Sequence, residues 1–308
     1  QNTYLKLFSP NIKRMKILTI DGNNLVHRVY WVANNIKNVS ENYHVYMFLN
    51  SVKSYVEMYQ PDKTFCVWDE KPDYKPNKRK ELLEDYKGNR DKEYGKEVHT
   101  KNEIIKEMLN TMGIPSIFPR SYEADDVIKI INDAYDKHCT TKFYITKKLF
   151  RHIIVTVDRD LCQLISSKVS VYDPIRKVEI NKENFKDILK YDKKDFIKVK
   201  ALTGDKSDNI PGLKGFGKVK IEKFLNGEVF LTEEEDNIYK RNLELVTLTE
   251  DKDEKEYVLN QLSEIKDTTN YNEFKKLSKE YKFSQIVKND TKWYTAFFQD
   301  NRLLELLS

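Results

Sequence analysis

Residues 153–160 read Ile-Ile-Val-Thr-Val-Asp-Arg-Asp, five β-branched residues followed by two aspartates on either side of an arginine. A short run of this kind is typical of a buried strand, because β-branched side chains pack well on a pleated sheet. Similar runs occur at Lys16–Ile20, Thr64–Trp68 and Ser116–Phe118, and apolar residues at helical spacing lie between them. Strands that alternate with helices predict an α/β fold with a mostly parallel central sheet flanked by helices.

Acidic residues follow three of these four predicted strands. Asp21 follows the first strand, Asp69 follows the second, and Asp158 and Asp160 follow the last. Because the ligand crevice of an open α/β sheet lies at the carboxyl ends of its strands, we expect these acids to share one edge. A simple Asp-Gly turn at Asp21 explains one acid but not all of them.

Two further stretches add carboxylates to this set. Glu123-Ala-Asp-Asp126 opens a helical pattern, and Thr203-Gly-Asp-Lys-Ser-Asp208 carries two aspartates three residues apart. Acids in a first helical turn also favour the helix dipole, which is a purely structural alternative. Carboxylates crowded together repel one another or take up protons unless cations neutralise them. Since oxygen ligands select hard ions, the sequence predicts a site for Mg²⁺ or Mn²⁺.

Four motifs in this order resemble the bacterial and bacteriophage 5′-nuclease family: Asp21-Gly-Asn-Asn24, Glu123–Asp126, Val155–Leu164 and Thr203–Gly212. That family includes the 5′-nuclease domain of bacterial DNA polymerase I and phage 5′-3′ exonucleases, and it is related to flap endonucleases. The resemblance covers roughly residues 16–248. It implies a structure-specific 5′-3′ exonuclease or flap endonuclease that hydrolyses DNA near 5′ ends or flap junctions in replication and repair.

The resemblance also implies two divalent ions that share one ligand. The residues that match the family's ligands are Asp21, Asp69, Glu123 and Asp125 for the first ion and Asp125, Asp158, Asp160 and Asp208 for the second, with Asp126 and Asp205 acting directly or through water. In such sites the ions lie about 3.5–4 Å apart. One ion lowers the pKa of an attacking water and the other stabilises the leaving oxygen, so the expected products carry a 5′-phosphate.

The stretch Lys71–Lys101 is rich in Lys, Arg, Glu and Tyr, which by itself fits a solvated loop. Within it, Asp85-Tyr-Lys-Gly-Asn-Arg90 resembles the family's helical arch, through or beneath which the 5′ strand passes. The resemblance implies that Lys87 and Arg90 reach the scissile phosphate and that Tyr86 stacks on a nearby base. Residues expected to attract DNA by charge are Lys71, Lys75, Lys78, Arg79 and Lys80.

A glycine-rich turn at residues 212–217 precedes the helical run Val219–Leu225. Such a turn can present backbone N–H groups to a phosphate, although it is a weak motif alone. It resembles the family's helix-hairpin-helix (H3TH) element, which grips duplex backbone without reading sequence and often binds a monovalent cation, here K⁺. The residues expected to bind DNA there are Gly212, Lys214, Gly215, Gly217, Lys218 and Lys220.

The expected organisation is an N-terminal extension over residues 1–15, a catalytic domain over 16–190 and a helical DNA-binding region over 191–308. The catalytic domain is expected to contain the arch at about 71–101 and an insertion at about 139–151, between a helix and a strand. A net charge of +5 fits DNA as the partner, including 5′ flaps, nicks and RNA–DNA primer hybrids. No apolar run is long enough for a membrane span, and we expect a monomer.

Three cysteines, an odd number without a C-x-x-C pair, indicate a reducing intracellular compartment. The first residue, Gln1, and the Lys-, Asn- and Tyr-rich composition favour an organellar protein of the apicoplast or plastid that has lost a targeting segment. The cytoplasm of a bacterial or phage-infected cell is the alternative.

Three other functions compete with a metal-dependent 5′-nuclease. A PIN-like RNase also gathers acids at strand ends, but it leaves the glycine turn and the basic arch unexplained. A non-catalytic DNA-binding protein of the same fold is expected to have lost acids, whereas every required position is filled. The third alternative is a eukaryotic-type flap endonuclease, which Met112-Gly-Ile-Pro115 resembles. However, Glu123–Asp126 and Thr203–Gly212 follow the bacterial pattern.

Overall fold

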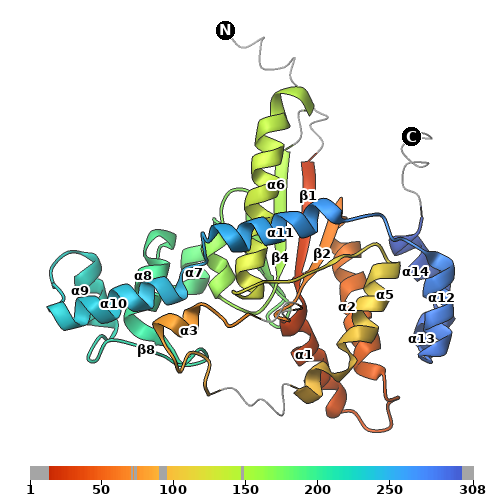
Figure 1. Cartoon of the computed structure of the whole chain (residues 1–308), viewed down its shortest axis with the longest axis horizontal. Helices are drawn as coiled ribbons and strands as arrows, with labels where there is room; N and C mark the ends of the chain where they lie inside the picture. Colours follow the sequence, from red (N-terminus) through yellow and green to blue (C-terminus); the bar gives the residue numbers. More distant parts are fainter. Residues whose placement is uncertain (1–13, 71, 73–74, 90–95, 147–148, 300–308) are drawn as a thin grey trace.

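The computed structural model describes residues 14–70, 72, 75–89, 96–146 and 149–299. Its centre is a six-stranded sheet with the strand order β3-β2-β1-β4-β5-β6 (Figure 1). The strands are β1 (Arg14–Asp21), β2 (Lys63–Val67), β3 (Ser116–Ile117), β4 (Leu149–Val155), β5 (Val169–Asp173) and β6 (Val178–Ile180). Strands β1 to β5 are parallel, and β6 pairs antiparallel with β5. The predicted mostly parallel sheet is confirmed, and β5 and β6 are strands that the sequence analysis did not identify.

The sheet is buried on both faces, which explains why its strands are runs of aliphatic residues. In β1, Leu18 and Ile20 pack on one face against α1 (Gly22–Asn34), α2 (Tyr43–Tyr59) and α5 (Asn102–Thr111). Ile17 packs on the other face against α6 (Ala124–Thr146) and α11 (Lys252–Glu264). This alternation follows from the period of two along a strand. All three β1 side chains are fully buried.

The segment expected to be an insertion continues the elements on either side of it. Helix α6 runs through Cys139 to Thr146, and β4 begins at Leu149. The Cys139 thiol lies 3.6 Å from the sulfur of Met15, so the second half of α6 is anchored to β1. The prediction of an insertion between the helix and the strand is therefore wrong for the residues that the structure describes there.

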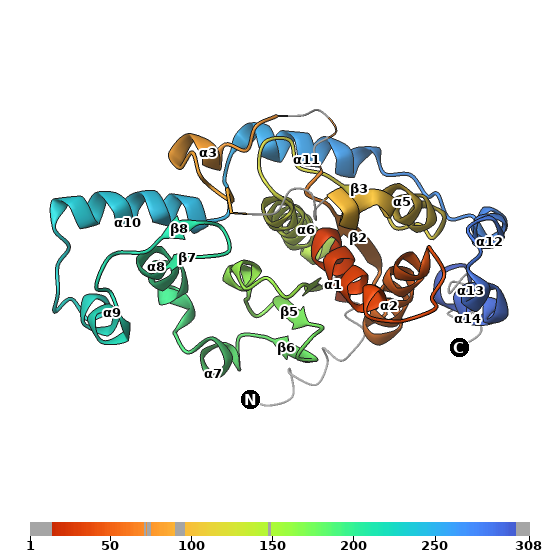
Figure 2. The same cartoon turned by 90° about the horizontal axis from the view of Figure 1, so that it is seen from below.

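A second group of helices lies beside the sheet, on the side of β5 and β6 (Figures 1 and 2). Its elements are α7 (Phe185–Leu189), α8 (Lys193–Thr203), the strand pair β7 (Gly204–Asp205) and β8 (Ile210–Pro211), α9 (Lys218–Leu225) and α10 (Glu233–Val246). Leu202, Phe216 and Ile221 form part of its own small core. This group contains the predicted helix-hairpin-helix turn between β8 and α9.

The chain then returns across the sheet in α11, as both figures show. It ends its described part in α12 (Tyr271–Glu280), α13 (Ser284–Lys288) and α14 (Asp290–Phe297), which pack near α2 and α5. The arch region contains α3 (Arg79–Leu82) and a short 3-10 turn, η2 (His99–Lys101). Within the described residues, no helix is both long enough and apolar enough to cross a membrane.

Candidate functional site

The carboxylate of Asp21 lies at the end of β1 and caps the first turn of α1. One oxygen accepts a hydrogen bond from the backbone N–H of Asn24 at 3.0 Å, and the other accepts from the hydroxyl of Thr156 at 2.8 Å. Asp69, just after β2, accepts from the backbone N–H of Ala124 at 2.8 Å. The bond from Thr156 holds the end of β1 against the end of β4. The bond from Ala124 holds the end of β2 against the start of α6. The predicted common edge is therefore present.

Two overlapping groups of acids lie at this edge. Carboxylate oxygens of Asp125, Asp158 and Asp160 lie within 4.8 Å of one another. Oxygens of Asp160, Asp205 and Asp208 meet the same limit. Asp160 opens the 3-10 helix η3 (Asp160–Leu164) and belongs to both groups. Oxygen ligands at this spacing suit one or two hard divalent cations.

The pKa values of Asp21 and Asp125 indicate that too little positive charge lies near them to neutralise these acids. Burial, together with the nearby carboxylates of Asp69 and Asp158, raises the pKa of Asp21 to about 7, although the hydrogen bonds from Asn24 and Thr156 oppose the shift. Burial also raises the pKa of Asp125 well above its usual range, with Asp158 and Asp21 adding to the effect. Carboxyl groups that resist ionisation in a crowded site are stabilised as anions by a bound cation. The donor set therefore fits divalent metal.

Two lysines supply part of the missing charge. The Lys87 ammonium donates to Glu123 at 2.5 Å and lies 3.8 Å from a carboxylate oxygen of Asp208. The Lys200 ammonium pairs with Asp160 and lies 2.8 Å from Asp205. Burial alone would raise the pKa of Asp205, but hydrogen bonds from Lys200 and Ser207 lower it to about 2.

Lys200 is a site residue that the sequence analysis missed. It lies in the last turn of α8, which leads directly into the motif Thr203–Asp208. A lysine one turn before that motif was the available signal, but in this chain it is one of 54 basic residues. Nothing in the local pattern separates it from its solvated neighbours.

The turn Asp85–Asn89 (the arch turn) is docked on the loop between β7 and β8. The backbone N–H of Lys87 donates to the carbonyl of Asp208 at 2.9 Å, and the side-chain amide of Asn209 donates to the carbonyl of Asp85 at 2.9 Å. The Asn89 amide donates to the carbonyl of Lys206 at 2.8 Å. This docking brings Lys87 to the acids, and its expected contact with the scissile phosphate remains a prediction.

Tyr86 does not occupy the predicted position. Its side chain is only 2% exposed, and the ring packs against Ala201 and Ile210. The phenol donates toward Glu123 at 2.9 Å and Asp208 at 3.2 Å. The prediction that Tyr86 stacks on a base is wrong for this structure, because the ring is buried between the arch turn and the helical region. The other predicted arch residue, Arg90, lies outside the described residues.

The Asp126 carboxylate lies in different surroundings from that of its neighbour Asp125. It is fully buried, and its two oxygens accept from the Arg79 guanidinium at 2.7 and 2.9 Å. The backbone N–H groups of Glu123 and Thr249 donate to the same carboxylate at 3.1 and 2.8 Å. The structure therefore does not bring Asp126 into either acidic group. Arg79 is 5% exposed, so the prediction that it attracts DNA by charge is wrong.

The other expected steering charges differ in their surroundings. Lys75 and Lys80 are exposed, whereas Lys78 is half-buried and pairs with Asp251 at 2.6 Å. Lys71 lies outside the described residues.

The family model described as "5′-3′ exonuclease, N-terminal resolvase-like domain" matches residues 16–198. The chain belongs to the 5′-3′ exonuclease family. Among its relatives, the 5′-3′ exonuclease of Mycoplasmopsis pulmonis is 32% identical over 232 residues, covering 75% of this chain and 73% of the relative. The 5′-3′ exonuclease of Bacillus subtilis is 33% identical over 220 residues, covering 68% and 69%.

A further relative is a much longer enzyme. DNA polymerase I of Caldicellulosiruptor bescii is 30% identical over 220 residues, which cover 68% of this chain but 24% of the polymerase. Among solved structures, the bacteriophage T5 D15 protein co-crystallised with metal ions superposes with a TM-score of 0.58 and 21% identity. That match covers 86% of this chain and 98% of the phage protein. At this identity the likeness shows the fold, and it confirms the predicted fold family.

In this exonuclease-family chain, Gly212 at the start of the glycine-rich turn packs directly against Gly204 at the end of α8. Gly204 has a φ of +71°, and a Cβ on it would lie 2.3 Å from the backbone nitrogen of Gly212. A Cβ on Gly212 would lie 2.2 Å from the carbonyl oxygen of Thr203. Both positions therefore need glycine, because backbone atoms cannot retreat as a flexible side chain can.

Beyond these glycines the turn exposes most of the predicted DNA-binding residues. Leu213 and Phe216 are buried anchors. The exposed residues are Lys214, Gly215, Gly217 and Lys218. Lys220 is engaged within the protein, since its ammonium lies 3.2 Å from Glu235 and 3.9 Å from the centre of the Phe216 ring.

Proposed function

We propose that this chain is a divalent-metal-dependent, structure-specific 5′-3′ exonuclease and flap endonuclease that removes flaps and primers during replication and repair. The observation that carries the proposal is the pair of overlapping carboxylate groups at the carboxyl edge of the sheet. Family membership supports it independently. A T5 D15 flap endonuclease of the same fold forms a pseudo-enzyme-product complex with DNA and metal ions.

We propose that eight carboxylates at this edge hold two Mg²⁺ or Mn²⁺ ions. They are Asp21, Asp69, Glu123, Asp125, Asp158, Asp160, Asp205 and Asp208. When bound, the ions supply positive charge to the phosphodiester and lower the pKa of a bound water. Asp126 is left out of this set, because Arg79 and two backbone N–H groups already use its oxygens.

The chain's own residues contribute position and charge. Lys87 is held at the acids by the docked arch turn, and we propose that its ammonium donates to the phosphate as negative charge develops there. Lys200 orients Asp160 and Asp205 through its two ion pairs. Both lysines are less than one-fifth exposed, so water screens their charges only partly.

We propose that the duplex binds along the turn before α9, where Lys214 and Lys218 are exposed. Contacts with phosphates fix the position of the duplex without reading its sequence, which suits an enzyme that recognises branched structure. We also propose that K⁺ binds at this turn, that the enzyme acts on RNA–DNA hybrids and that it is a monomer. We propose the same division as the sequence predicted, with a catalytic domain over residues 16–190 and a DNA-binding region over residues 191–308.

An organellar location has no support from the relatives described above, which are bacterial.

The test is cleavage of a 5′-labelled flap substrate with Mg²⁺, with Mn²⁺ and with EDTA, beside a linear single strand. We expect metal-dependent release of the flap near the junction. Asp158→Asn should nearly abolish cleavage but leave DNA binding in EDTA within about threefold of wild type. Asp136→Asn is the matched control, since Asp136 lies farther along α6 in a partly exposed pair with Lys168.

Two outcomes would overturn the proposal. Tight binding of the flap without cleavage in either metal would instead support a DNA-binding protein that keeps the nuclease fold. Cleavage by Asp158→Asn at the wild-type rate would show that the acidic groups are not the active site.

A further inference from the structure

We infer that Arg79 is a positioning residue of this nuclease. It joins the start of α6, where proposed metal ligands lie, to the end of α10 in the proposed DNA-binding region. The inference rests on the proposed function, because it concerns how fast this site cleaves DNA. It assigns Arg79 a task other than the attraction of DNA, and it does not make Arg79 a metal ligand.

The guanidinium group of Arg79 makes five hydrogen bonds, which equal its five N–H donors. Two go to Asp126 at 2.7 and 2.9 Å, and one goes to Glu123 at 3.3 Å. The other two go to the carbonyls of Leu245 at 2.9 Å and Thr247 at 3.2 Å. One planar group therefore ties two acids at the start of α6 to the last residues of α10.

Two more side chains hold the same stretch, Leu245–Thr249 (the junction segment). Asp126 accepts from the backbone N–H of Thr249 at 2.8 Å. The amide of Gln163 donates to the carbonyl of Val246 and accepts from the N–H of Leu248, both at 3.2 Å. Gln163 lies in η3, the turn that begins with the proposed ligand Asp160. The junction segment is thus fixed to two elements that contain or adjoin proposed ligands.

Arg79 also connects this junction to the arch turn. It is the first residue of α3, and the arch turn that carries Lys87 begins three residues after the end of α3. Arg79, Lys87 and Tyr86 all reach Glu123. A shift of the guanidinium would therefore alter the position of Glu123 relative to both the arch and the helical region.

Lysine cannot replace this arrangement. An ammonium has three donors on one nitrogen, whereas the guanidinium fork spans two carboxylates and two carbonyls in one plane. The Arg79 side chain is 6% exposed and Asp126 is 0% exposed, so water cannot fill the place of a missing donor easily. Side chains that orient metal ligands typically change metal affinity or activity by about 10–100-fold when removed.

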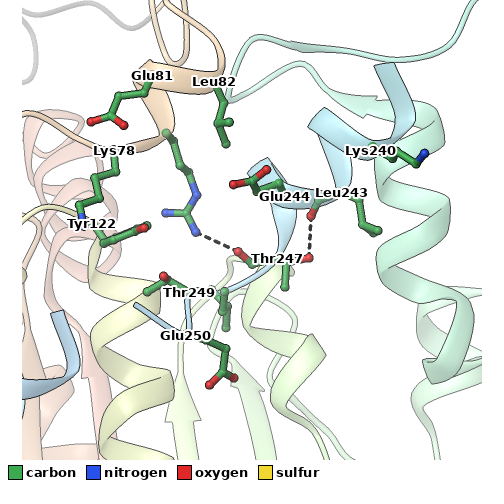
Figure 3. A pocket seen from close by; sticks show the side chains of 12 residues that line it. Lys78, Glu81, Leu82, Tyr122, Lys240, Leu243, Glu244, Thr247, Thr249 and Glu250 are labelled. Carbon is green, nitrogen blue, oxygen red and sulfur yellow. Dashed lines mark hydrogen bonds between the residues drawn. The ribbon is translucent and has the colours of Figure 1, made fainter. Parts of the chain in front are cut away.

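A cavity of about 500 Å³ lies beside Arg79 and allows a chemical test. Figure 3 shows Tyr122 and Lys78 on one side of it and Leu243, Glu244 and Thr247 on the other. The Tyr122 ring lies 5.6 Å from the guanidinium carbon. Arg79→Ala would extend this cavity to the partners of the lost group. Added guanidinium ion has the right shape and charge to occupy that space.

The experiment measures single-turnover cleavage of the flap substrate by Arg79→Ala at saturating enzyme across a Mg²⁺ titration. We expect the rate to fall about 10–100-fold, with a higher Mg²⁺ requirement. Guanidinium ion at low millimolar concentration should restore at least part of the rate, and methylammonium at the same concentration should not. Arg151→Ala is the matched control, because Arg151 forms a half-exposed ion pair with Glu179 at the opposite end of β4.

A second variant keeps the inference testable if Arg79→Ala fails to fold. Arg79→Lys retains the positive charge and loses the fork, and we expect it to cleave at least about tenfold more slowly than wild type. A folded Arg79→Lys or Arg79→Ala protein with a rate and Mg²⁺ requirement within twofold of wild type would overturn the inference. An inactive wild-type protein would overturn the proposed function first, so the two failures are distinguishable.

Discussion

Asp125 and Asp126 are neighbours in the first turn of α6, yet their carboxylates lie in different surroundings. Asp125 lies beside Asp158 and Asp160, and burial with this crowding raises its pKa. Asp126 is bound by Arg79 and two backbone N–H groups. Successive helical residues differ by about 100° in direction, so one acid faces the sheet edge while the other faces the junction segment. The same turn therefore provides a proposed ligand and an anchor.

Lys87 provides a prediction at this scale, since its ammonium competes with any cation for Glu123. We expect Lys87→Ala to lower the single-turnover cleavage rate about 100- to 1000-fold, the usual effect of removing one electrostatic donor from a reacting group. The Mg²⁺ concentration for half-maximal rate should stay equal or fall, because the competing ammonium at 2.5 Å from Glu123 is gone.

The control for this variant is Lys168→Ala, which removes a half-exposed lysine paired with Asp136. It should cleave within twofold of wild type. A Lys87→Ala protein with a normal rate, or one that needs much more Mg²⁺, would contradict the assigned role. The second outcome would mean that Lys87 helps to order the acids rather than to stabilise the reaction.

Much of the acidic site could be predicted from the sequence, because its motifs place charge directly at strand ends. Asp21, Asp69, Asp158 and Asp160 lie where their strands predicted. The surroundings of Asp126 could not be predicted, since its partner Arg79 is 47 residues away in the sequence. Pairings at that separation depend on tertiary packing, which local patterns do not encode.

At the scale of elements, the turn that joins α8 to α9 depends on close backbone contact. The two-residue strands β7 and β8 form one antiparallel pair, and this pair closes the loop that carries Asp205 and Asp208. Gly212 follows β8 directly and lies against Thr203 at the end of α8. The loop with the acids and the turn with the exposed lysines therefore share one support.

We expect Gly212→Ala to lower the free energy of unfolding by about 2–3 kcal/mol, since a Cβ would lie 2.2 Å from a backbone oxygen. For a chain of this size that corresponds to a fall in Tm of several degrees. Gly217→Ala is the matched control, because its φ is −82° and no atom lies within 4 Å of its added Cβ. Thermal unfolding of both variants checks this. Equal Tm values would contradict the packing argument.

The sequence predicted the first four strands of the sheet but not its last two. The four strand predictions fall within a few residues of β1 to β4, because aliphatic runs in the middle of a parallel sheet are distinctive. Val169–Asp173 is an inner strand with four of its five residues buried, and it was missed because Ser170 and Asp173 interrupt its apolar run. Val178–Ile180 was missed because it is a three-residue edge strand with a single buried position. The supposed insertion was misjudged because its basic and aromatic residues resemble a loop, although they continue α6.

At the scale of the whole molecule, the acidic groups combine residues from the edge of the sheet with residues from the second group of helices. The sheet brings Asp21 and Asp158, the helical group brings Asp205 and Asp208, and the arch turn brings Lys87. Burial of unneutralised acids at this meeting point costs stability in the metal-free protein. Metal binding should therefore stabilise the fold as well as enable cleavage, and the size of that effect should depend on pH.

The sign of this dependence follows from Asp21, whose pKa is raised from about 4 to about 7 by burial and neighbouring acids. A carboxyl whose pKa is raised in the folded protein does not lower stability below its unfolded pKa of about 4, and it lowers stability progressively as pH rises from there to about 7. His152 acts oppositely, since burial lowers its pKa to about 3, but that effect is the same with and without metal. The pKa of Asp205 is lowered to about 2, so its contribution changes only at more acidic pH.

We therefore expect Mg²⁺ to raise the Tm by several degrees more at pH 8 than at pH 5.5, because at pH 8 the cation binds carboxylates that are already ionised and otherwise repel. Thermal unfolding at saturating Mg²⁺ and in EDTA measures this difference. Asp21→Asn should reduce the pH dependence, since it removes the group that titrates near 7, whereas Asp136→Asn should leave it unchanged. An equal Mg²⁺ effect at the two pH values would mean that the metal-free site is not strained by its own charge.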